Sequence, residues 1–95
     1  MARYITLIRF TGQGAKNLKK SPVRAQAFRK AAEKFGVQVE AQYWTVGACD
    51  GVLILNADDE KKALHCLTNL AAGSNVRTET MQAFDAGEFA AIVGK

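Results

Sequence analysis

The sequence predicts an α+β sandwich, and two observations support this fold class. Segment 43–55 holds two extended apolar runs separated by a tight polar break with Gly47, Asp50 and Gly51. This pattern is typical of a β-hairpin, and here the hairpin lies in the middle of the chain. The residues before it predict a strand and a helix, and the residues after it predict a helix and a strand. The order of elements is therefore βαββαβ.

The 95 residues form a single domain, residues 1–95, whose core buries roughly 60 to 65% of the surface of the unfolded chain. Hydrophobic residues make up 48% of the chain and charged residues 23%, which is the balance of an ordinary globular protein. No apolar run approaches the roughly 20 residues of a membrane helix, and segment 1–10 alternates where a signal peptide would be solidly apolar. We therefore expect a soluble cytoplasmic protein with no membrane partner.

The first strand is predicted at residues 3–10, where side chains alternate with a period of two. Both faces of this strand carry apolar residues, so the sequence leaves open which face meets the helices. Segment 11–20 contains Gly12, Gly14 and Asn17 and predicts a loop.

A helix is predicted to begin at Ser21 and Pro22, because a hydroxyl N-cap followed by the fixed φ of proline suits a helix start. Gly36 ends this helix. Its apolar stripe recurs at helical spacing and predicts the core face. The residues of the stripe are Val23, Ala27, Phe28, Ala31 and Phe35.

Strands two and three are predicted at residues 37–45 and 51–55, and the second of these is apolar on both faces, as in a covered central strand. Acidic residues then precede a second helix, where the positive end of the helix dipole favours negative charge. This helix ends at Gly73. The acidic residues are Asp58, Asp59 and Glu60, and the stripe of the helix is Ala63, Leu64, Leu67, Leu70 and Ala71.

A polar, threonine-rich strand is predicted at residues 76–83, followed by a short last helix. Asp85 and Glu88 have the spacing of a capping box that opens this helix. Its apolar residues are Phe89, Ile92 and Val93.

These elements assemble into a ferredoxin-like split βαβ sandwich with both long helices on one face. Right-handed crossovers give an antiparallel sheet of spatial order 4-1-3-2. Because strand three is apolar on both faces, the other face of the sheet needs a cover, which is the terminal helix, a second copy of the chain, or both. We expect a homo-oligomer, most simply a dimer.

Three motifs identify a family that the chain resembles over essentially its whole length. They are S-P-x-R at Ser21–Arg24, Y-W-T-x-G-x-x-D at Tyr43–Asp50 and N-V-R-T-E-T at Asn75–Thr80. Together they resemble the GYD domain family, which consists of small ferredoxin-like proteins without an agreed biochemical activity. The resemblance implies the fold and an assembly like that of dimeric α/β barrels. Cys49 stands here where the family's namesake turn has tyrosine.

The three motifs should converge at one end of the sheet, where the hairpin and the start of the first helix meet. Arg24 lies beside the inner stripe of its helix and needs a partner, for which Asp50 and Glu79 are the candidates and Arg77 is a second cation. One interpretation is a structural ion pair between Arg24 and Asp50, the commoner use of such pairs.

The other interpretation is a small cleft at the same end of the sheet that binds a carboxylate or another small polar ligand. Its tentative ligand-binding residues are Arg24, Asp50, Arg77, Tyr43 and Trp44, with Phe10 as a further apolar wall.

No catalytic, metal or cofactor motif is present in the sequence. His65 is the one histidine and lies away from the apolar stripe of its helix, which leaves no base for a nucleophilic triad. The run G-Q-G-A-K at 12–16 lacks the spacing of a phosphate-binding loop. Cys49 and Cys66 have neither disulfide nor metal spacing and are expected to be small buried or half-buried residues.

Positive charge is concentrated in residues 1–34, which hold nine of the thirteen Lys and Arg, whereas residues 35–95 hold eight of the nine acidic residues. The basic residues belong to the loop 11–20 and the first helix, and strand three lacks the aromatic residues that stack on RNA bases. We expect only weak, non-specific attraction to nucleic acid.

Two functions remain open. The first is a homo-oligomeric module for small-ligand binding or protein interaction. The alternative, by analogy of fold, is a cofactor-free oxygenase or isomerase of the dimeric α/β-barrel type. Such an enzyme needs a polar group inside an apolar cavity, and the suppliers would be Tyr43, Thr6 or Asp50.

Overall fold

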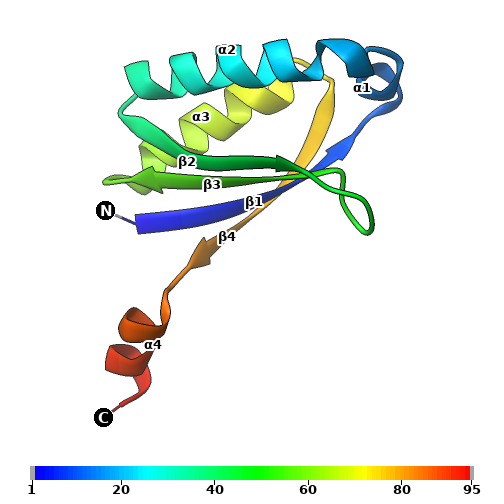
Figure 1. Cartoon of the computed structure of the whole chain (residues 1–95). Coiled ribbons are helices and arrows are strands. Elements are labelled where there is room, and N and C mark those ends of the chain that lie inside the picture. The colour runs from blue at the N-terminus through cyan, green and yellow to red at the C-terminus, as the bar shows by residue number, and fades with distance from the viewer. Residues whose placement is uncertain (1, 95) are drawn as a thin grey trace.

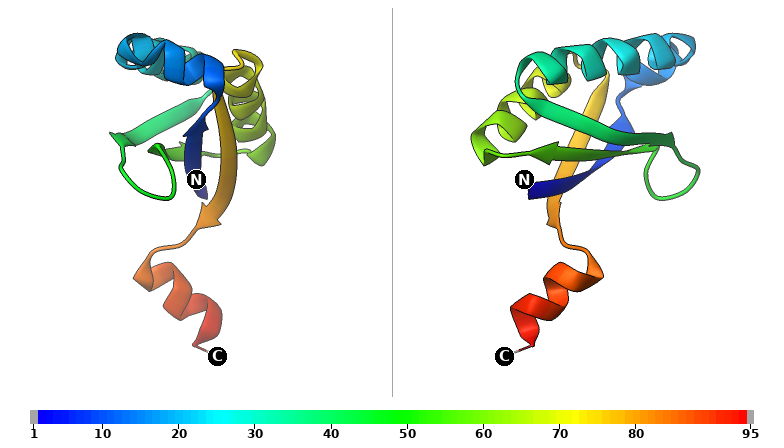
Figure 2. Two further views of the ribbon diagram at one scale, coloured as in Figure 1. Left: turned by 90° about the vertical axis from the view of Figure 1, so that its right-hand side faces the viewer. Right: turned by 60° about the vertical axis from the view of Figure 1, so that its left-hand side comes forward.

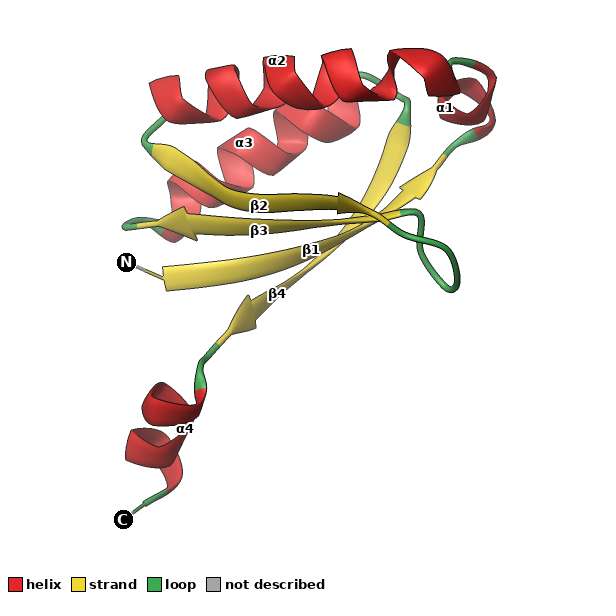
Figure 3. Ribbon diagram, in the orientation of Figure 1, coloured by secondary structure: helices red, strands yellow, loops and turns green. Residues whose placement is uncertain are grey.

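The computed structural model describes residues 2–94 and confirms the predicted order of strands and long helices (Figures 1 and 3). Four antiparallel strands form one sheet of order β2-β3-β1-β4, which is the predicted order. The elements are β1 (Ala2–Phe10), α1 (Gly12–Lys16), the 3₁₀ turn η1 (Leu18–Lys20), α2 (Ser21–Lys34), β2 (Val37–Trp44), β3 (Gly51–Ala57), α3 (Glu60–Ala72), β4 (Val76–Ala83) and α4 (Ala86–Val93).

Helices α2 and α3 cover one face of the sheet and leave the other face open (Figures 1 and 2). Leu53 and Leu55 of β3 point to the helices and are buried, whereas Ile54 between them points to the open side. Thr6, which pairs with Leu53, is completely buried. The pairing therefore shows which side of β1 meets the helices: its even-numbered residues, including Tyr4.

The core lies between the helices and the sheet, and its helix residues differ from part of the predicted stripes. Val23 is 70% exposed and Leu64 is 63% exposed, whereas Ala32 and Cys66 are buried. Burial on α3 follows the spacing i, i+3, i+4, which selects residues 63, 66 and 67 and excludes Leu64. The buried hydrophobic residues are Phe28, Ala32, Val37, Val39, Leu53, Leu55, Ala57, Ala63, Cys66 and Leu67.

The segment predicted as a loop, 11–20, is mostly helical. The Thr11 side chain accepts a hydrogen bond from the backbone N–H of Gly14 at 3.1 Å and caps α1. Gly14 is buried, and a Cβ there would overlap the backbone oxygen of Asn75. The glycine that suggested a loop thus permits a close approach of two backbones inside a helix.

A joint between the start of α1 and the start of β4 holds this end of the fold together. Thr11 donates its backbone N–H to the Asn75 carbonyl at 3.0 Å and its hydroxyl to the Ser74 carbonyl at 2.6 Å. Gln13 adds a long side-chain hydrogen bond to the Gly73 carbonyl at 3.4 Å. We call residues 11–14 together with 73–75 the α1–β4 joint.

Ser21 does not cap α2, which corrects the sequence prediction. Lys20 occupies the N-cap position without a side-chain hydrogen bond, and Pro22 lies in the first turn as expected. The Ser21 hydroxyl instead accepts a hydrogen bond from the Trp44 indole N–H at 3.0 Å. Ser21 is buried because it lies against the end of β2 rather than at a free helix end.

Helix α4 begins with the predicted capping box, in which Asp85 and Glu88 exchange two hydrogen bonds of 2.8 Å. The helix projects from the end of β4 on the side opposite α2 and α3, and it does not lie over the open face (Figure 2). The radius of gyration, 14.1 Å, exceeds the about 12 Å expected for a compact chain of this length. Within residues 2–94, the terminal helix therefore does not cover the open face.

Candidate functional site

A cavity of about 360 Å³ lies between the helices and the hairpin end of the sheet. It is bordered by residues of β1, α2, β2, β3, α3 and the start of β4. Its apolar wall includes Ile8, Phe10, Phe28, Leu53, Leu70 and Val76, and its polar residues are Ser21, Arg24, Gln42, Asp50, Asn69 and Asn75. Four of the five predicted site residues, all except Arg77, border this cavity.

Only one of the two terminal nitrogens of Arg24 has a hydrogen-bond partner among the described residues. Its Nη1 donates a hydrogen bond to the Asn17 carbonyl at 3.0 Å. Its Nη2 is buried and has no hydrogen-bond partner among the described residues. Leaving a buried donor without a partner costs roughly 1 to 3 kcal/mol, and more for a charged group. The free end of this guanidinium is therefore the least satisfied polar group of the site.

Asp50 fastens the hairpin to the end of β1. Its Oδ2 accepts a hydrogen bond from the Phe10 backbone N–H at 2.9 Å, and its own N–H donates to the Ile8 carbonyl at 2.8 Å. The Asp50 carbonyl also accepts from the Thr45 N–H at 2.9 Å. The Asp50 carboxylate thus serves as the hydrogen-bond acceptor for the Phe10 backbone N–H.

The expected ion pair between Arg24 and Asp50 is absent within residues 2–94. Both residues border the same cavity, but Arg24 bonds to the Asn17 carbonyl and Asp50 to the Phe10 N–H. Each of the two side chains therefore bonds to a backbone group instead of to the other side chain. The sequence did not predict the Asn17 partner, because the helical segment that contains Asn17 was predicted as a loop.

The two aromatic residues at the end of β2 have different surroundings. The Trp44 indole is directed to the helix side, where it donates to Ser21. Tyr43 also borders the cavity, but strand alternation places its ring on the open face, opposite Val52, and the residue is 61% exposed. Trp44 therefore belongs to the cavity wall more closely than Tyr43 does.

Arg77 lies outside the cavity. It pairs with Arg9 in the register of β1 and β4 and is exposed on the open face. Glu79, the other suggested partner of Arg24, lies on the same face and forms an ion pair with Arg9 at 3.7 Å. The strand period of two separates these residues from the helix side of the sheet.

The remaining reactive side chains of the described chain offer no catalytic arrangement. His65 is exposed and its ring contacts the Phe35 ring edge-on, with centroids 4.5 Å apart. The Thr6 hydroxyl shares a hydrogen bond of 2.9 Å with the Thr80 hydroxyl. Cys66 is buried in the core, as predicted, and this burial raises the pKa of its thiol. Among residues 2–94, no cluster of His, Cys, Asp or Glu could hold a metal ion.

A second candidate surface is the open face of the sheet, which carries two apolar rows across the strands. One row contains Ala41, Ile54, Ile5 and Met81. The next contains Tyr43, Val52 and Leu7 and ends at the charged Glu79. Met81 is 47% exposed. We define the open face by the seven apolar residues of these rows.

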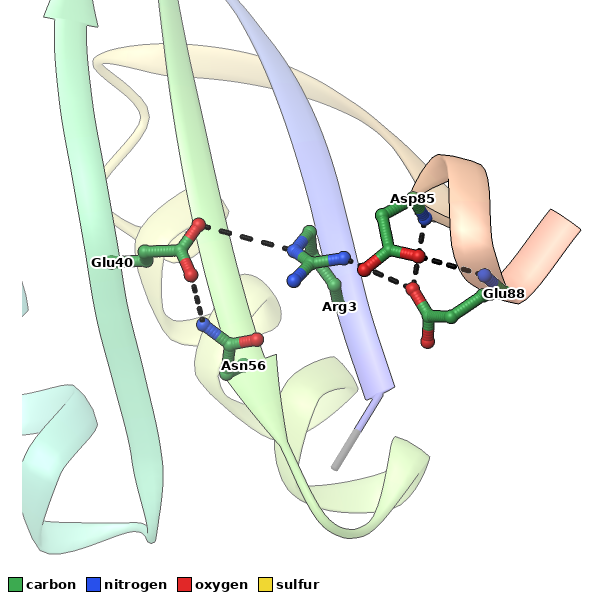
Figure 4. A network of polar contacts seen from close by, with 5 residues as sticks. All are labelled: Arg3, Glu40, Asn56, Asp85 and Glu88. Atoms are coloured by element: carbon green, nitrogen blue, oxygen red, sulfur yellow. Dashed lines mark hydrogen bonds and ion pairs between the residues drawn. The ribbon is translucent and has the colours of Figure 1, made fainter.

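Charged residues of both signs flank the open face at each end. At one end Arg3 lies between Glu40 of β2, at 3.9 Å, and Glu88 of α4, at 3.2 Å, and Asn56 donates to Glu40 at 3.2 Å (Figure 4). Glu40 reaches this position because the pairing of β2 with β3 shifts between residues 39 and 41. At the other end lie Arg9, Arg77 and Glu79.

Sequence reasoning found most of the cavity's charged and aromatic residues but missed the roles of Ser21 and Asn17. Ser21 supplies the acceptor for the Trp44 indole, and Asn17 supplies the carbonyl for Arg24. Ser21 and Trp44 both belong to the motifs that define the family resemblance, and this shared membership is the one signal that could have paired them.

Comparisons with known proteins agree with this fold. The chain is 33% identical over 92 residues to the glutamine synthetase and cystathionine beta-lyase binding protein of Thermus thermophilus, covering 96% of this chain and 97% of the relative. A crystal structure of a protein from the same organism superposes with a TM-score of 0.59 at 28% identity, covering 90% of this chain and 96% of the other.

The crystal structure of MtbAldR superposes with a TM-score of 0.68 at 16% identity, over 88% of this chain and 52% of that one, a likeness of fold alone. No described helix of the chain combines the length and the apolar character needed to cross a bilayer. The family model for the GYD domain matches residues 4–93. The chain belongs to the GYD domain family.

Proposed function

We propose that this chain is a homo-oligomeric interaction module, which pairs with a second copy through the open face and binds other proteins. The observation that carries the proposal is the open face itself, whose apolar rows are not covered by any helix among the described residues. A contiguous apolar surface of this kind on a folded domain marks an interaction site.

The charge pattern favours a second copy as the first partner. A two-fold contact brings the same surface of both copies together, so a self-complementary face is required. The open face meets this requirement, since each end carries both signs of charge around an apolar centre, with Arg3 and Glu40 at one end and Arg9 and Glu79 at the other. Two such sheets can stack face to face about 10 Å apart.

Helix α4 supports the same arrangement. Phe89, Ile92 and Val93 are each more than half exposed, so the apolar side of this helix is not covered by residues 2–94. The helix projects on the side of the open face and is tethered there by the bond from Arg3 to Glu88 (Figures 2 and 4). A second copy stacked on the open face would lie within reach of this helix.

The identity of further protein partners is suggested by the relative from Thermus thermophilus, whose name states that it binds glutamine synthetase and cystathionine beta-lyase. The relative matches over almost the full length of both chains. We propose that this chain likewise binds enzymes of amino-acid metabolism. Exposed apolar residues at the hairpin and after β4, Val46 and Phe84, are available for such contacts.

Sedimentation equilibrium of Leu7→Glu tests the self-association. Leu7 lies in the centre of the open face, so a buried carboxylate there should convert the dimer to a monomer. Val23→Glu is the matched control, because Val23 is 70% exposed on the outer side of α2. A wild-type monomer at micromolar concentration, or a Leu7→Glu dimer as tight as wild type, would refute the sheet-face dimer.

Biolayer interferometry against purified glutamine synthetase and cystathionine beta-lyase tests the partner proposal. We expect saturable binding of at least one enzyme by the wild-type chain, and an unrelated enzyme of similar charge serves as control. Absence of binding to both enzymes by a correctly folded oligomer would contradict the transfer of this role from the relative.

A second candidate, small-ligand binding, is favoured by the cavity beside Arg24. The catalytic alternative has less support, because each suggested polar supplier has another role. The Thr6 hydroxyl bonds to Thr80, the Asp50 carboxylate bonds to the Phe10 N–H, and the Tyr43 ring lies on the open face.

A further inference from the structure

We infer that the cavity is a site for a small organic monocarboxylate with an apolar body, whose carboxylate bonds to the free end of Arg24. This inference names the ligand class for the second candidate function above and rests on it. It is independent of the open face, which lies on the other side of the sheet.

The guanidinium of Arg24 supplies the anion contact. Its Nη1 donates to the Asn17 carbonyl at 3.0 Å. Its Nη2 is buried and has no hydrogen-bond partner within residues 2–94, and the residue borders the cavity. A carboxylate is the group that best matches the planar fork of an arginine. Because the bond from Nη1 to the Asn17 carbonyl holds the guanidinium in place, the side chain is already oriented before a ligand binds.

The rest of the cavity suits an apolar body. Its volume of about 360 Å³ lies within the range of roughly 300 to 1,000 Å³ typical of small-molecule sites. Phe28, Leu53 and Leu70 form its floor against the core. Helix α2 also contributes small residues to the wall, among them Ala27 and Ala31, and their short side chains leave space for a ligand.

A single negative charge fits the site better than a phosphate or a dicarboxylate. Arg24 is the one basic residue that borders the cavity within residues 2–94, and Arg77 lies on the open face. The Asp50 carboxylate borders the same cavity and would repel additional negative charge. The charges around the cavity therefore select a monocarboxylate.

Trp44 provides the readout, because it is the chain's one tryptophan and borders the cavity. We would titrate wild-type protein with cyclohexanecarboxylate and, as the uncharged match, with cyclohexanecarboxamide, and follow tryptophan fluorescence and amide chemical shifts. The expected result is saturable binding of the carboxylate, at least tenfold tighter than the amide, with shifts confined to residues around the cavity.

Variants distinguish the anion contact from the cavity. Arg24→Gln should weaken carboxylate binding at least tenfold and leave amide binding unchanged. Arg29→Gln on the same helix is the matched control and should bind both probes like wild type, since Arg29 does not border the cavity. Ala31→Phe should fill the space and abolish binding of both probes, and the circular dichroism spectrum of each variant reports whether it folds.

Two kinds of result would overturn the inference. The first contradicts only the preference for carboxylates, and the second contradicts ligand binding by the cavity as well. If the carboxylate and the amide bind equally well, or if Arg24→Gln binds the carboxylate like wild type, the cavity binds ligands but does not select carboxylates. If the folded wild-type protein binds neither probe, ligand binding by the cavity fails together with its proposed specificity.

Discussion

The Trp44 indole donates a hydrogen bond of 3.0 Å to the Ser21 hydroxyl and so joins the last residue of β2 to the first residue of α2. Both residues border the cavity. The bond explains why a serine at a helix start is buried instead of capping the helix, and it fixes the distance between helix and sheet at the cavity.

Ser21→Ala should lower the free energy of unfolding by about 1 kcal/mol, because it leaves the indole N–H without its acceptor. In the background of Trp44→Phe, which lacks the indole donor, the same change should have a much smaller effect. Urea denaturation of the two single variants and the double variant measures this coupling. Additive effects would show that Ser21 stabilises the helix start independently of Trp44.

Asp50→Ala should cost about 1 to 3 kcal/mol, since it strands the Phe10 backbone N–H that the carboxylate binds. Asp50→Asn keeps an acceptor oxygen and should cost less. Because Arg24 and Asp50 form no ion pair, the effects of Asp50→Ala and Arg24→Met should add to within about 0.5 kcal/mol. A larger coupling energy in urea denaturation would indicate that the two side chains do form the ion pair that the sequence suggested.

Gly14→Ala should destabilise the fold by about 1 to 3 kcal/mol, because the new Cβ would collide with the backbone oxygen of Asn75 and force the α1–β4 joint apart. Gly12→Ala lies in the same short helix with nothing within 4 Å of the added Cβ. This control should be neutral or slightly stabilising. Thermal unfolding of both variants gives the comparison, and equal melting temperatures would contradict the close approach.

Cys66 should make the fold sensitive to alkaline pH. Burial raises the pKa of its thiol above the ordinary value of 9.0, so the unfolded chain loses this proton first. The stability contributed by the neutral thiol is complete below the unfolded pKa and is lost as pH rises through the folded pKa.

The measurement for Cys66 is urea denaturation as a function of pH, together with Cys66→Ala. The variant should lose the part of the alkaline decline that the thiol causes. Iodoacetamide at pH 8 should modify the half-buried Cys49 faster than Cys66 in the folded protein. Equal rates of modification would mean that Cys66 is accessible.

The sequence sufficed for the strand order and for the approximate boundaries of the strands and long helices, because period-two strands and glycine-terminated helices leave strong local signals. Gly36 and the Asp85–Glu88 box act as predicted, and Asp59, expected as negative charge at the start of its helix, is the N-cap of α3. The helix stripes were predicted less well. Val23 has the right chemistry for a core position but lies off the line that connects Phe28 and Ala32.

The bonds of the site could not be predicted, because they depend on backbone groups brought together by the fold. A carbonyl such as that of Asn17 has the same chemistry in every residue, so nothing in the sequence marks it as the partner of Arg24. The shift in pairing at Glu40 is likewise invisible in the hydrophobic pattern. Residue types at the cavity were predictable, whereas their hydrogen-bond partners were not.

The α1–β4 joint should form late in folding. The bond from Thr11 to Ser74 connects residues 63 positions apart, and contacts of long sequence separation form late because they close a large loop. We therefore expect the local β2–β3 hairpin to form before the pairing of β1 with β4 and the α1–β4 joint. Native-state hydrogen exchange should show weaker protection of the Thr11 amide in the joint than of the core strand β3. Transient opening there would admit solutes without unfolding the core.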